Sequence, residues 1–417
     1  MKLTTTALGV VLALSAVPAA AQLTRSTSTD NEKPQAQKAP EGEPQLRPSN
    51  GAMKAILDLQ TSVNANDYAS VPAKVAAAQQ VAKTPVDKYL ISQLQLKGAL
   101  AAKDNAGIST AIDGVANSGY LADKTKISGL YQSLGASLYN EKQFPQAAAA
   151  FQKAIAQNPN DPEAYAMLGE SQNAQGQKAE SIASFQRAIQ LGSASGTKPR
   201  EEMYKRAVGL AYNAKAPVAA ELGRQWIAAY PGTDSWKNGI AIYRNLNSPD
   251  VESTLDLLRL MQATGALNSA ADYSLYATAA ADQANYVEAK AAIDAGIAAK
   301  IVDPASPMFR DTVAGLKAKN IPTEADLAEA LKASQTSATL VRVGNSYYGM
   351  GQYAKAADLY RQAVTKGGTD ADLANLHLGM ALARSGDKAG ATAALNAVKG
   401  ARADIAKYWL LYLQTHG

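Results

Sequence analysis

The chain has 417 residues, of which 47% are hydrophobic, mostly Ala and Leu, with only 4 Phe and 3 Trp. Small apolar residues favour closely packed helices over sheets. The absence of Cys excludes disulfides, thiolate metal sites and cysteine nucleophiles. A formal charge of +5 over this length, without a long basic run, indicates neither a nucleic-acid nor an acidic-membrane partner.

Residues 1–21 have the pattern of a secretory signal peptide. Lys2 precedes an apolar stretch that ends at Val17, and Ala19 and Ala21 are the small residues that such a signal places before its cleavage point. The apolar run is too short to span a bilayer comfortably, which argues against a membrane anchor. No Cys follows the cleavage point, so lipidation is not expected, and no later segment is apolar enough to cross a membrane. We therefore expect an exported protein cut after Ala21.

Residues 22–50 are rich in Ser, Thr, Pro, Gln and charge, and are predicted to form a disordered linker because they cannot bury enough apolar surface. Residues 51–126 are predicted to be helical, as an N-terminal extension of two degenerate helix pairs that also caps the open end of the fold. The expected helices in this part are 52–64, 71–82, 86–102 and 106–117.

A 34-residue period organises the next part of the chain. The residues that recur at this distance include Tyr131 and Tyr165, Leu134 and Leu168, Gly135 and Gly169, Gln143 and Gln177, Phe151 and Phe185, and Ala154 and Ala188. A third copy in 337–369 has Leu340, Gly344, Tyr347, Gln352 and Tyr360 in the same relative places. A fixed period of this length predicts a stack of helix pairs.

The residues of one repeat explain how a pair packs. Tyr131, Leu134 and Leu138 lie on one stripe of a helix, and Phe151 belongs to the facing stripe of the second helix. Gly135 weakens a helix relative to Ala, so we expect it at a close crossing where Phe151 fills the space above it. Asp161 is a good N-cap and Pro162 suits the first turn, which predicts the start of the next pair.

The rest of the chain is predicted to continue the stack, with repeats over 128–234, divergent helix pairs over 235–336, and C-terminal repeats with a capping helix over 337–417. The expected segments are the pairs 202–231, 235–265 and 269–300, two helices within 303–334, the clear repeat 337–369, a final repeat 372–399, and a terminal helix 403–414 that covers the last repeat.

The recurring pattern, an aromatic residue followed by Leu-Gly, then Ala-x3-Phe-x2-Ala and Pro, resembles the tetratricopeptide repeat family. That resemblance implies an all-α, right-handed α-solenoid of stacked antiparallel helix pairs, whose first helices line a concave groove for a peptide or partner protein. It also implies a non-enzymatic role without a cofactor. Because repeats of this kind are common in the bacterial periplasm, the periplasm is the expected destination.

Candidate partner-binding residues lie opposite the core stripe of the first helices. They are Gln132, Tyr139, Asn140, Glu163, Glu170, Asn173, Arg342, Asn345 and Tyr348. Amides, tyrosines and a few charges suit reversible peptide recognition, although a plain solvated surface explains any one of them equally well. A clamp for a terminal carboxylate, known in some members of the family, is not expected, because Val341 stands where such a clamp has Lys.

No constellation in the sequence predicts catalysis or metal binding. The chain has 2 His residues, of which His416 is next to last and His377 is predicted to be a surface or groove residue. No His-x3-His or Cys pair could hold zinc, and the nucleotide-binding glycine motifs are missing. We therefore expect no enzyme, no metal and no cofactor.

Three functions follow from these observations. The first is a protein–protein interaction scaffold or adaptor in cell-envelope assembly or secretion, with a protein or peptide partner. The second is an enzyme-associated superhelix, as in some peptidoglycan-cleaving enzymes, which would need a sheet or compact lobe between residues 235 and 334. The third is a homo-oligomeric structural protein whose repeats bind one another. Neither the partner nor the oligomeric state follows from the sequence.

Overall fold

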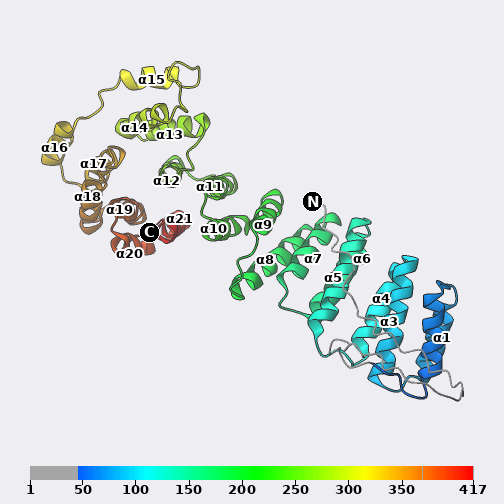
Figure 1. The fold of residues 1–417 in the computed structure, drawn as a ribbon. Coiled ribbons are helices and arrows are strands. Elements are labelled where there is room, and N and C mark those ends of the chain that lie inside the picture. The colour runs from blue at the N-terminus through cyan, green and yellow to red at the C-terminus, as the bar shows by residue number, and fades with distance from the viewer. Residues whose placement is uncertain (1–45, 369, 417) are drawn as a thin grey trace, which may run out of the picture. The chain divides into compact units, whose positions relative to one another are not determined.

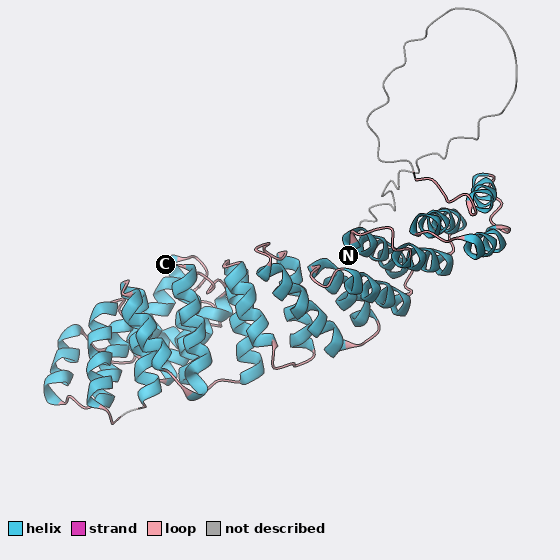
Figure 2. Cartoon of the chain, turned by 90° about the horizontal axis from the view of Figure 1, so that it is seen from below, coloured by secondary structure: helices cyan, strands magenta, loops and turns pink. Residues whose placement is uncertain are grey.

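The computed structural model describes residues 46–368 and 370–416, and within them the secondary structure is entirely helical (Figures 1 and 2). The predicted signal peptide and residues 22–45 of the predicted linker lie outside the described residues. None of the described helices has the length and hydrophobicity that a bilayer crossing requires. The entirely helical secondary structure of the described residues confirms the all-α prediction.

The chain divides into two compact units, with unit 1 ending at Thr197 and unit 2 beginning at Lys198. The boundary follows the Gly- and Ser-rich residues 192–197 and falls inside the block 128–234 that we predicted as continuous repeats. That block is therefore shared by the two units. Each unit is described separately below.

Unit 1 contains eight helices in the described residues. Their bounds are α1 Met53–Asn64, α2 Val71–Val81, α3 Pro85–Ala102, α4 Asn105–Asn117, α5 Lys124–Asn140, α6 Phe144–Gln157, α7 Pro162–Ala174 and α8 Lys178–Ala194. Helices α1, α2 and α3 pack on one another, and from α3 onward each helix packs on the next. The side chain of Asp161 accepts a hydrogen bond from the backbone of Glu163, with Pro162 in the first turn of α7. The predicted start of this repeat is confirmed.

The recurring glycines are wedged against large rings, as predicted. A Cβ atom added to Gly135 would lie 2.8 Å from the ring of Phe151, and one on Gly169 would lie 2.9 Å from Phe185. Gly344 has the same relation to Tyr360 in unit 2, at 2.7 Å. Real Cβ atoms are not found this close, so the glycine creates the space in which the aromatic ring packs. This contact fixes the spacing of the two helices in each clear pair.

The end of the predicted linker is ordered, which corrects the boundary at residue 50. The backbone N–H and the hydroxyl of Ser49 donate to Asp87 at 2.7 and 2.8 Å, and Pro48 is buried. The same carboxylate accepts from the backbone N–H of Thr84 in the capping box of α3. Leu46 packs on the adjoining core. The sequence did not reveal this attachment, because the segment has a low overall hydrophobicity and is held through a single buried acid, Asp87.

Unit 2 contains thirteen α-helices and one short 3-10 helix in the described residues. Their bounds are α9 Glu201–Asn213, α10 Ala219–Ala229, α11 Thr233–Asn247, α12 Val251–Ala263, α13 Ala270–Asp282, α14 Tyr286–Ala298, α15 Arg310–Lys317, α16 Glu324–Ala333, α17 Ser337–Gly349, α18 Tyr353–Lys366, α19 Ala371–Ser385, α20 Lys388–Ala397, η1 Gly400–Arg402 and α21 Ala403–Thr415. All predicted helices of this part are present.

Helices α15 and α16 leave the stack as an excursion. Helix α14 packs directly on α17, and α15 and α16 run along the outside of this contact (Figure 1). They are short and bury only Leu316 and Leu327. Two helices were predicted here, but they do not form a further pair of the stack.

The terminal helix does more than cover the last repeat. Helix α21 packs on α19 and α20 as predicted, and it also packs on α10 and α12 at the beginning of unit 2 (Figure 1). The hydroxyl of Tyr408 donates to the carbonyl of Gly239 on α11, 169 positions away, at 3.2 Å. Unit 2 is therefore closed on itself, whereas a simple solenoid joins only neighbouring repeats.

Candidate functional site

The first helices α5 and α7 form one continuous surface on unit 1. They pack side by side, and the amide of Gln132 donates to Asp161 at 2.8 Å, which joins α5 to the start of α7. Gln132 therefore lies on this surface and also makes a hydrogen bond that holds the two helices together. We call this surface the first-helix face of unit 1.

The other five residues predicted on this face are accessible to different degrees. Asn140 is exposed, whereas Tyr139, Glu163, Glu170 and Asn173 are half-buried. The ring of Tyr139 lies edge-on to Phe144, with centroids 5.3 Å apart. A fixed, half-exposed tyrosine beside amides can contact a peptide with little loss of side-chain entropy. These residues lie on two helices that contact each other.

The three residues predicted on α17 do not form an equivalent surface in unit 2. Arg342 is exposed, but Tyr348 is only 4% exposed and its ring lies 4.9 Å from the Arg259 guanidinium. Asn345 accepts from the Tyr360 hydroxyl at 2.7 Å, and its carbonyl accepts from Asn285 at 3.2 Å. The prediction is wrong for Tyr348, and Asn345 belongs to an internal network. Closure of unit 2 buries positions that an open stack would expose.

His377 is not on the surface or in a groove, because it is 1% exposed within a buried ionic cluster. Its Nε2 lies 3.0 Å from Asp256. Arg259 donates to Asp256 at 2.9 Å and makes two hydrogen bonds with Glu288, at 2.7 and 2.6 Å. The cluster therefore joins α12, α14 and α19.

The electrostatics of this cluster favour its charged form. Burial by itself would raise the pKa of Asp256, but the interactions with His377, Arg259 and Arg402 hold that pKa below its ordinary value. Burial would lower the pKa of Arg259, yet Glu288 and Asp256 keep it well above the ordinary value. A sequence signal did exist, because Asp256 and Arg259 are the only charges in the buried run 255–261. Such a pair inside an apolar run predicts burial with a partner.

A partly open cavity of about 210 Å³ adjoins this cluster. Its lining includes Glu288 and the three tyrosines Tyr276, Tyr348 and Tyr353. Glu288 accepts from Arg259, Tyr276 and Asn285 and is fully engaged within the protein. The cavity thus contains no free charged group.

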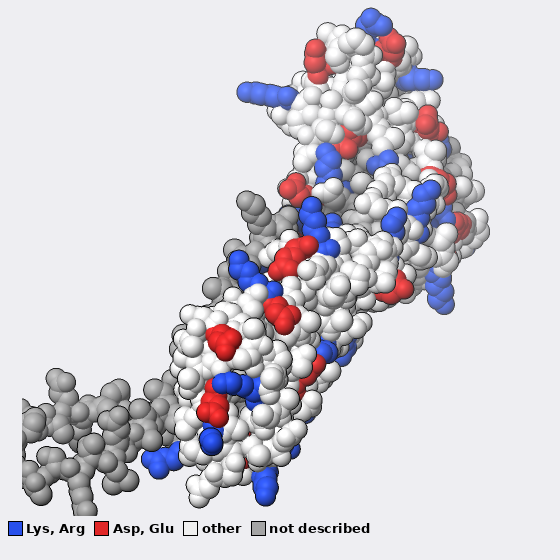
Figure 3. Space-filling model, turned by 90° about the vertical axis from the view of Figure 1, so that its right-hand side faces the viewer, with Lys and Arg blue, Asp and Glu red and all other residues white. Residues whose placement is uncertain are grey.

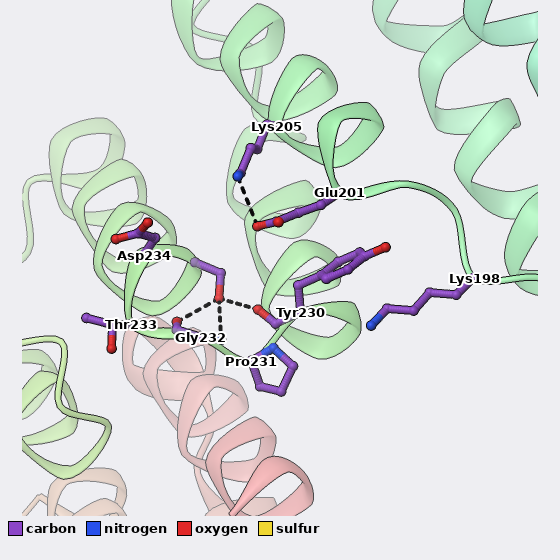
Figure 4. Close-up of a pocket in the computed structure, with 9 residues that line it drawn as sticks. Lys198, Glu201, Lys205, Tyr230, Pro231, Gly232, Thr233 and Asp234 are labelled. Atoms are coloured by element: carbon purple, nitrogen blue, oxygen red, sulfur yellow. Dashed lines mark hydrogen bonds and ion pairs between the residues drawn. The ribbon is translucent and has the colours of Figure 1, made fainter.

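A second, open pocket of about 540 Å³ lies where the segment before α9 meets the start of α11 (Figure 4). Glu201 pairs with Lys205 at 3.1 Å and accepts from the Trp226 indole at 3.1 Å. The hydrogen bond from Trp226 makes the largest contribution to lowering the pKa of Glu201, and the one from Lys205 makes the next largest. Lys198 lies 3.6 Å from the centroid of the Tyr230 ring. Acids and bases are balanced in this pocket, so it does not select one sign of charge.

The described residues do not assemble a metal site. Across residues 46–368 and 370–416, no three His, Cys, Asp or Glu side chains come together as metal ligands would. Basic and acidic side chains are interspersed on the face shown in Figure 3. This mixture fits the small net charge and agrees with a surface that recognises proteins.

The structure defines an all-α protein of stacked helix pairs, the class that includes the helical-repeat interaction scaffolds. The tetratricopeptide repeat model matches residues 133–196 and 343–405, which contain the wedged Gly135, Gly169 and Gly344. These two regions are tetratricopeptide repeats, as the resemblance in the sequence implied. In general terms the chain is a protein-interaction scaffold.

Solved structures similar to this chain include other helical-repeat proteins. A tetratricopeptide repeat protein from Parabacteroides merdae is 9% identical, with 71% of this chain and 99% of that chain covered and a TM-score of 0.29. The C-terminal part of a tetratricopeptide repeat-containing protein from Cytophaga hutchinsonii is 11% identical, with coverages of 77% and 98% and a TM-score of 0.25. The maize pentatricopeptide repeat protein PPR10 is 16% identical, with coverages of 86% and 51% and a TM-score of 0.27. No curated protein matches the chain in sequence.

Proposed function

We propose that the chain is an exported, non-enzymatic adaptor that holds an extended segment of a partner protein on the first-helix face of unit 1, in cell-envelope assembly or secretion. The observation that carries the proposal is the contact between α5 and α7, joined by the Gln132–Asp161 hydrogen bond, with Tyr139, Glu163, Glu170 and Asn173 half-buried on these two helices. In unit 2, Tyr348 is buried and Asn345 is hydrogen-bonded within the protein, whereas Arg342 is exposed. Export rests on the pattern of residues 1–21.

Binding at this face is tested by cross-linking pull-down from envelope extract, with Tyr139→Lys and Asn173→Lys as paired changes. A bound segment would lose contact with the tyrosine ring and the amide, so captured protein is expected to fall at least tenfold. Gln152→Lys is the matched control, because Gln152 is exposed on the second helix α6. If the paired changes and the control capture the same proteins in equal amounts, the face is not the binding surface.

Export is tested separately by mass spectrometry of the protein from fractionated cells. The expected product begins at Gln22 and is found in the envelope fraction. Full-length protein retained inside the cell would contradict the export proposal and would leave the binding proposal unaffected.

The alternatives make different predictions. Residues 235–334 fold as α11–α16 without a strand, so the sheet expected for an enzyme-associated form is not observed in this described segment. The homo-oligomeric alternative predicts a sedimentation coefficient above that of a monomer, which measurement on the purified protein would decide.

A further inference from the structure

The cavity beside the buried ionic cluster of unit 2 has no role in the proposed function. Its volume is about 210 Å³, and its walls come from α12, α13, α14, α17, α18 and the turn between α17 and α18. Protein interiors are close-packed and contain few voids larger than a water molecule. A cavity of about 150 Å³ is enough to hold benzene, so this one has room for one six-membered ring with a small substituent.

The aromatic wall of this cavity is held in place by bonds within the protein. The Tyr276 hydroxyl donates to Glu288 at 2.9 Å, and the Tyr353 hydroxyl accepts from Arg384 at 3.0 Å. The rings of Tyr348 and Tyr353 lie edge-on, with centroids 5.0 Å apart. The three tyrosine rings are therefore positioned before anything binds, which lowers the entropic cost of binding.

One hydroxyl of this wall is unsatisfied. Tyr348 is 4% exposed, and its hydroxyl has no hydrogen-bond partner in the described part of the chain. Burial raises the pKa of Tyr348 well above its ordinary value, so the hydroxyl keeps its hydrogen and remains a donor. A buried donor without an acceptor is costly, which favours a molecule that brings an acceptor to this hydroxyl.

The charges at the cavity favour an uncharged ligand. Glu288 is the charged residue of the lining, and it already accepts from Arg259, Tyr276 and Asn285. A ligand with a net charge would lose its hydration without meeting a free counter-charge. The wall therefore suits a neutral ring with one hydrogen-bonding substituent, and phenol is the simplest group that combines the two.

We propose that this cavity is a binding site for a phenol group, with the ring among Tyr276, Tyr348 and Tyr353 and the phenol oxygen accepting from the Tyr348 hydroxyl. The phenol group belongs either to a free small molecule or to a tyrosine side chain of a partner protein, and both present the same chemistry to the cavity. The site lies in unit 2 and does not involve the first-helix face of unit 1, so either assignment can fail without the other.

The test measures binding of p-cresol to the full chain by ligand-observed nuclear magnetic resonance and calorimetry. p-Cresol reproduces the side chain of tyrosine, and it is expected to bind with a dissociation constant of about 1 mM or below. Toluene has the same ring without the hydroxyl and is expected to bind about fivefold more weakly, because the Tyr348 hydroxyl then stays unsatisfied. A Gly-Tyr-Gly peptide with both ends capped is the probe for a tyrosine side chain.

Three variants locate the bound ring. Tyr348→Phe removes a hydroxyl that has no partner in the described part of the chain, so the variant should fold normally, bind p-cresol about fivefold more weakly and bind toluene as before. Tyr347→Phe, on the same helix but outside the lining, is the matched control and should bind p-cresol within about twofold of the unmodified protein. Ala291→Leu places a larger side chain at the cavity wall and should abolish binding of both aromatic probes. Circular dichroism checks that each variant is folded.

The outcomes decide the proposal. Absence of p-cresol binding up to its solubility limit would show that the cavity holds only water and would overturn the proposal. Equal binding of p-cresol to the unmodified protein and to folded Ala291→Leu would place the probe elsewhere on the molecule, and equal binding to Tyr348→Phe would remove the assigned hydrogen bond, so either result would also overturn it. If p-cresol binds as expected, tighter binding of the capped peptide identifies a partner's tyrosine as the source, whereas binding of p-cresol alone identifies a free small molecule.

Discussion

His377 Nε2 lies 3.0 Å from Asp256 Oδ1 although the two residues are 121 positions apart, and both are buried. The interactions with His377, Arg259 and Arg402 hold the pKa of Asp256 below its ordinary value despite its burial. The contact joins α19 to α12, so repeats distant in the chain are held together in the interior of unit 2. Arg259 lies between Asp256 and Glu288 and compensates both carboxylates.

Replacing Arg259 with Met is expected to destabilise unit 2 by about 3–5 kcal/mol, because two buried carboxylates lose their shared cation. The free energy of unfolding from urea titration measures this. Arg342→Met on α17 is the control, because Arg342 is exposed, and its effect should stay within about 0.5 kcal/mol. Equal effects of the two changes would mean that the cluster contributes no more than a surface charge.

Gly135→Ala is expected to lower stability by about 1–3 kcal/mol, because the new methyl group overlaps the Phe151 ring. Phe151→Leu in the same chain should recover part of this loss by freeing the space. Gly209→Ala is the matched change on α9, where an added Cβ would meet nothing within 4 Å. It should stabilise the protein by up to about 1 kcal/mol through helix propensity. Thermal unfolding of the three variants distinguishes wedged from free glycines, and destabilisation by Gly209→Ala would contradict this assignment.

Asp87→Asn is expected to cost about 2 kcal/mol at neutral pH. Burial alone would raise the pKa of Asp87, but hydrogen bonds from Ser49 and Thr84 lower it from 3.8 to about 2. A lowered pKa stabilises the fold while the carboxylate is ionised, so the contribution is complete above about pH 4 and is lost as the pH falls toward 2.

The measurement for Asp87 is the free energy of unfolding against pH for both proteins. The two curves should converge between pH 4 and 2, while exchange of the Ser49 amide should be faster in the variant at neutral pH. Asp58→Asn, on the exposed side of α1, is the control. A gap between the Asp87 curves that did not change with pH would show that the carboxylate charge is not the cause.

Trypsin is expected to cut the described helices first at Lys317 or Lys319. Both are exposed on the α15–α16 excursion, and local opening is easiest where few apolar residues are buried. The two fragments should remain together in size-exclusion chromatography, because α14 packs directly on α17. First cleavage within α17–α19 would contradict this order of local stability.

The sequence predicted the helices and their pairing but not the closure of unit 2. The 34-residue period reports contacts between neighbours, and it located Gly135 against Phe151 correctly because both residues lie in one repeat. It contains no information on helices far apart in the chain, so His377 and Tyr348 were placed on accessible surfaces. The attachment of Ser49 to Asp87 was missed for a related reason, since one buried carboxylate does not change the composition of a segment.

The hydrogen bond between Tyr408 and Gly239 also has a consequence for biosynthesis, because the ribosome adds its two partners at different times. At the usual speed of translation, 169 residues take about 10 to 30 s. During that interval the nascent chain exposes the face of α10–α12 that α21 will later cover. A chaperone that shields aromatic-binding surfaces would therefore be needed most between the emergence of α12 and the end of synthesis.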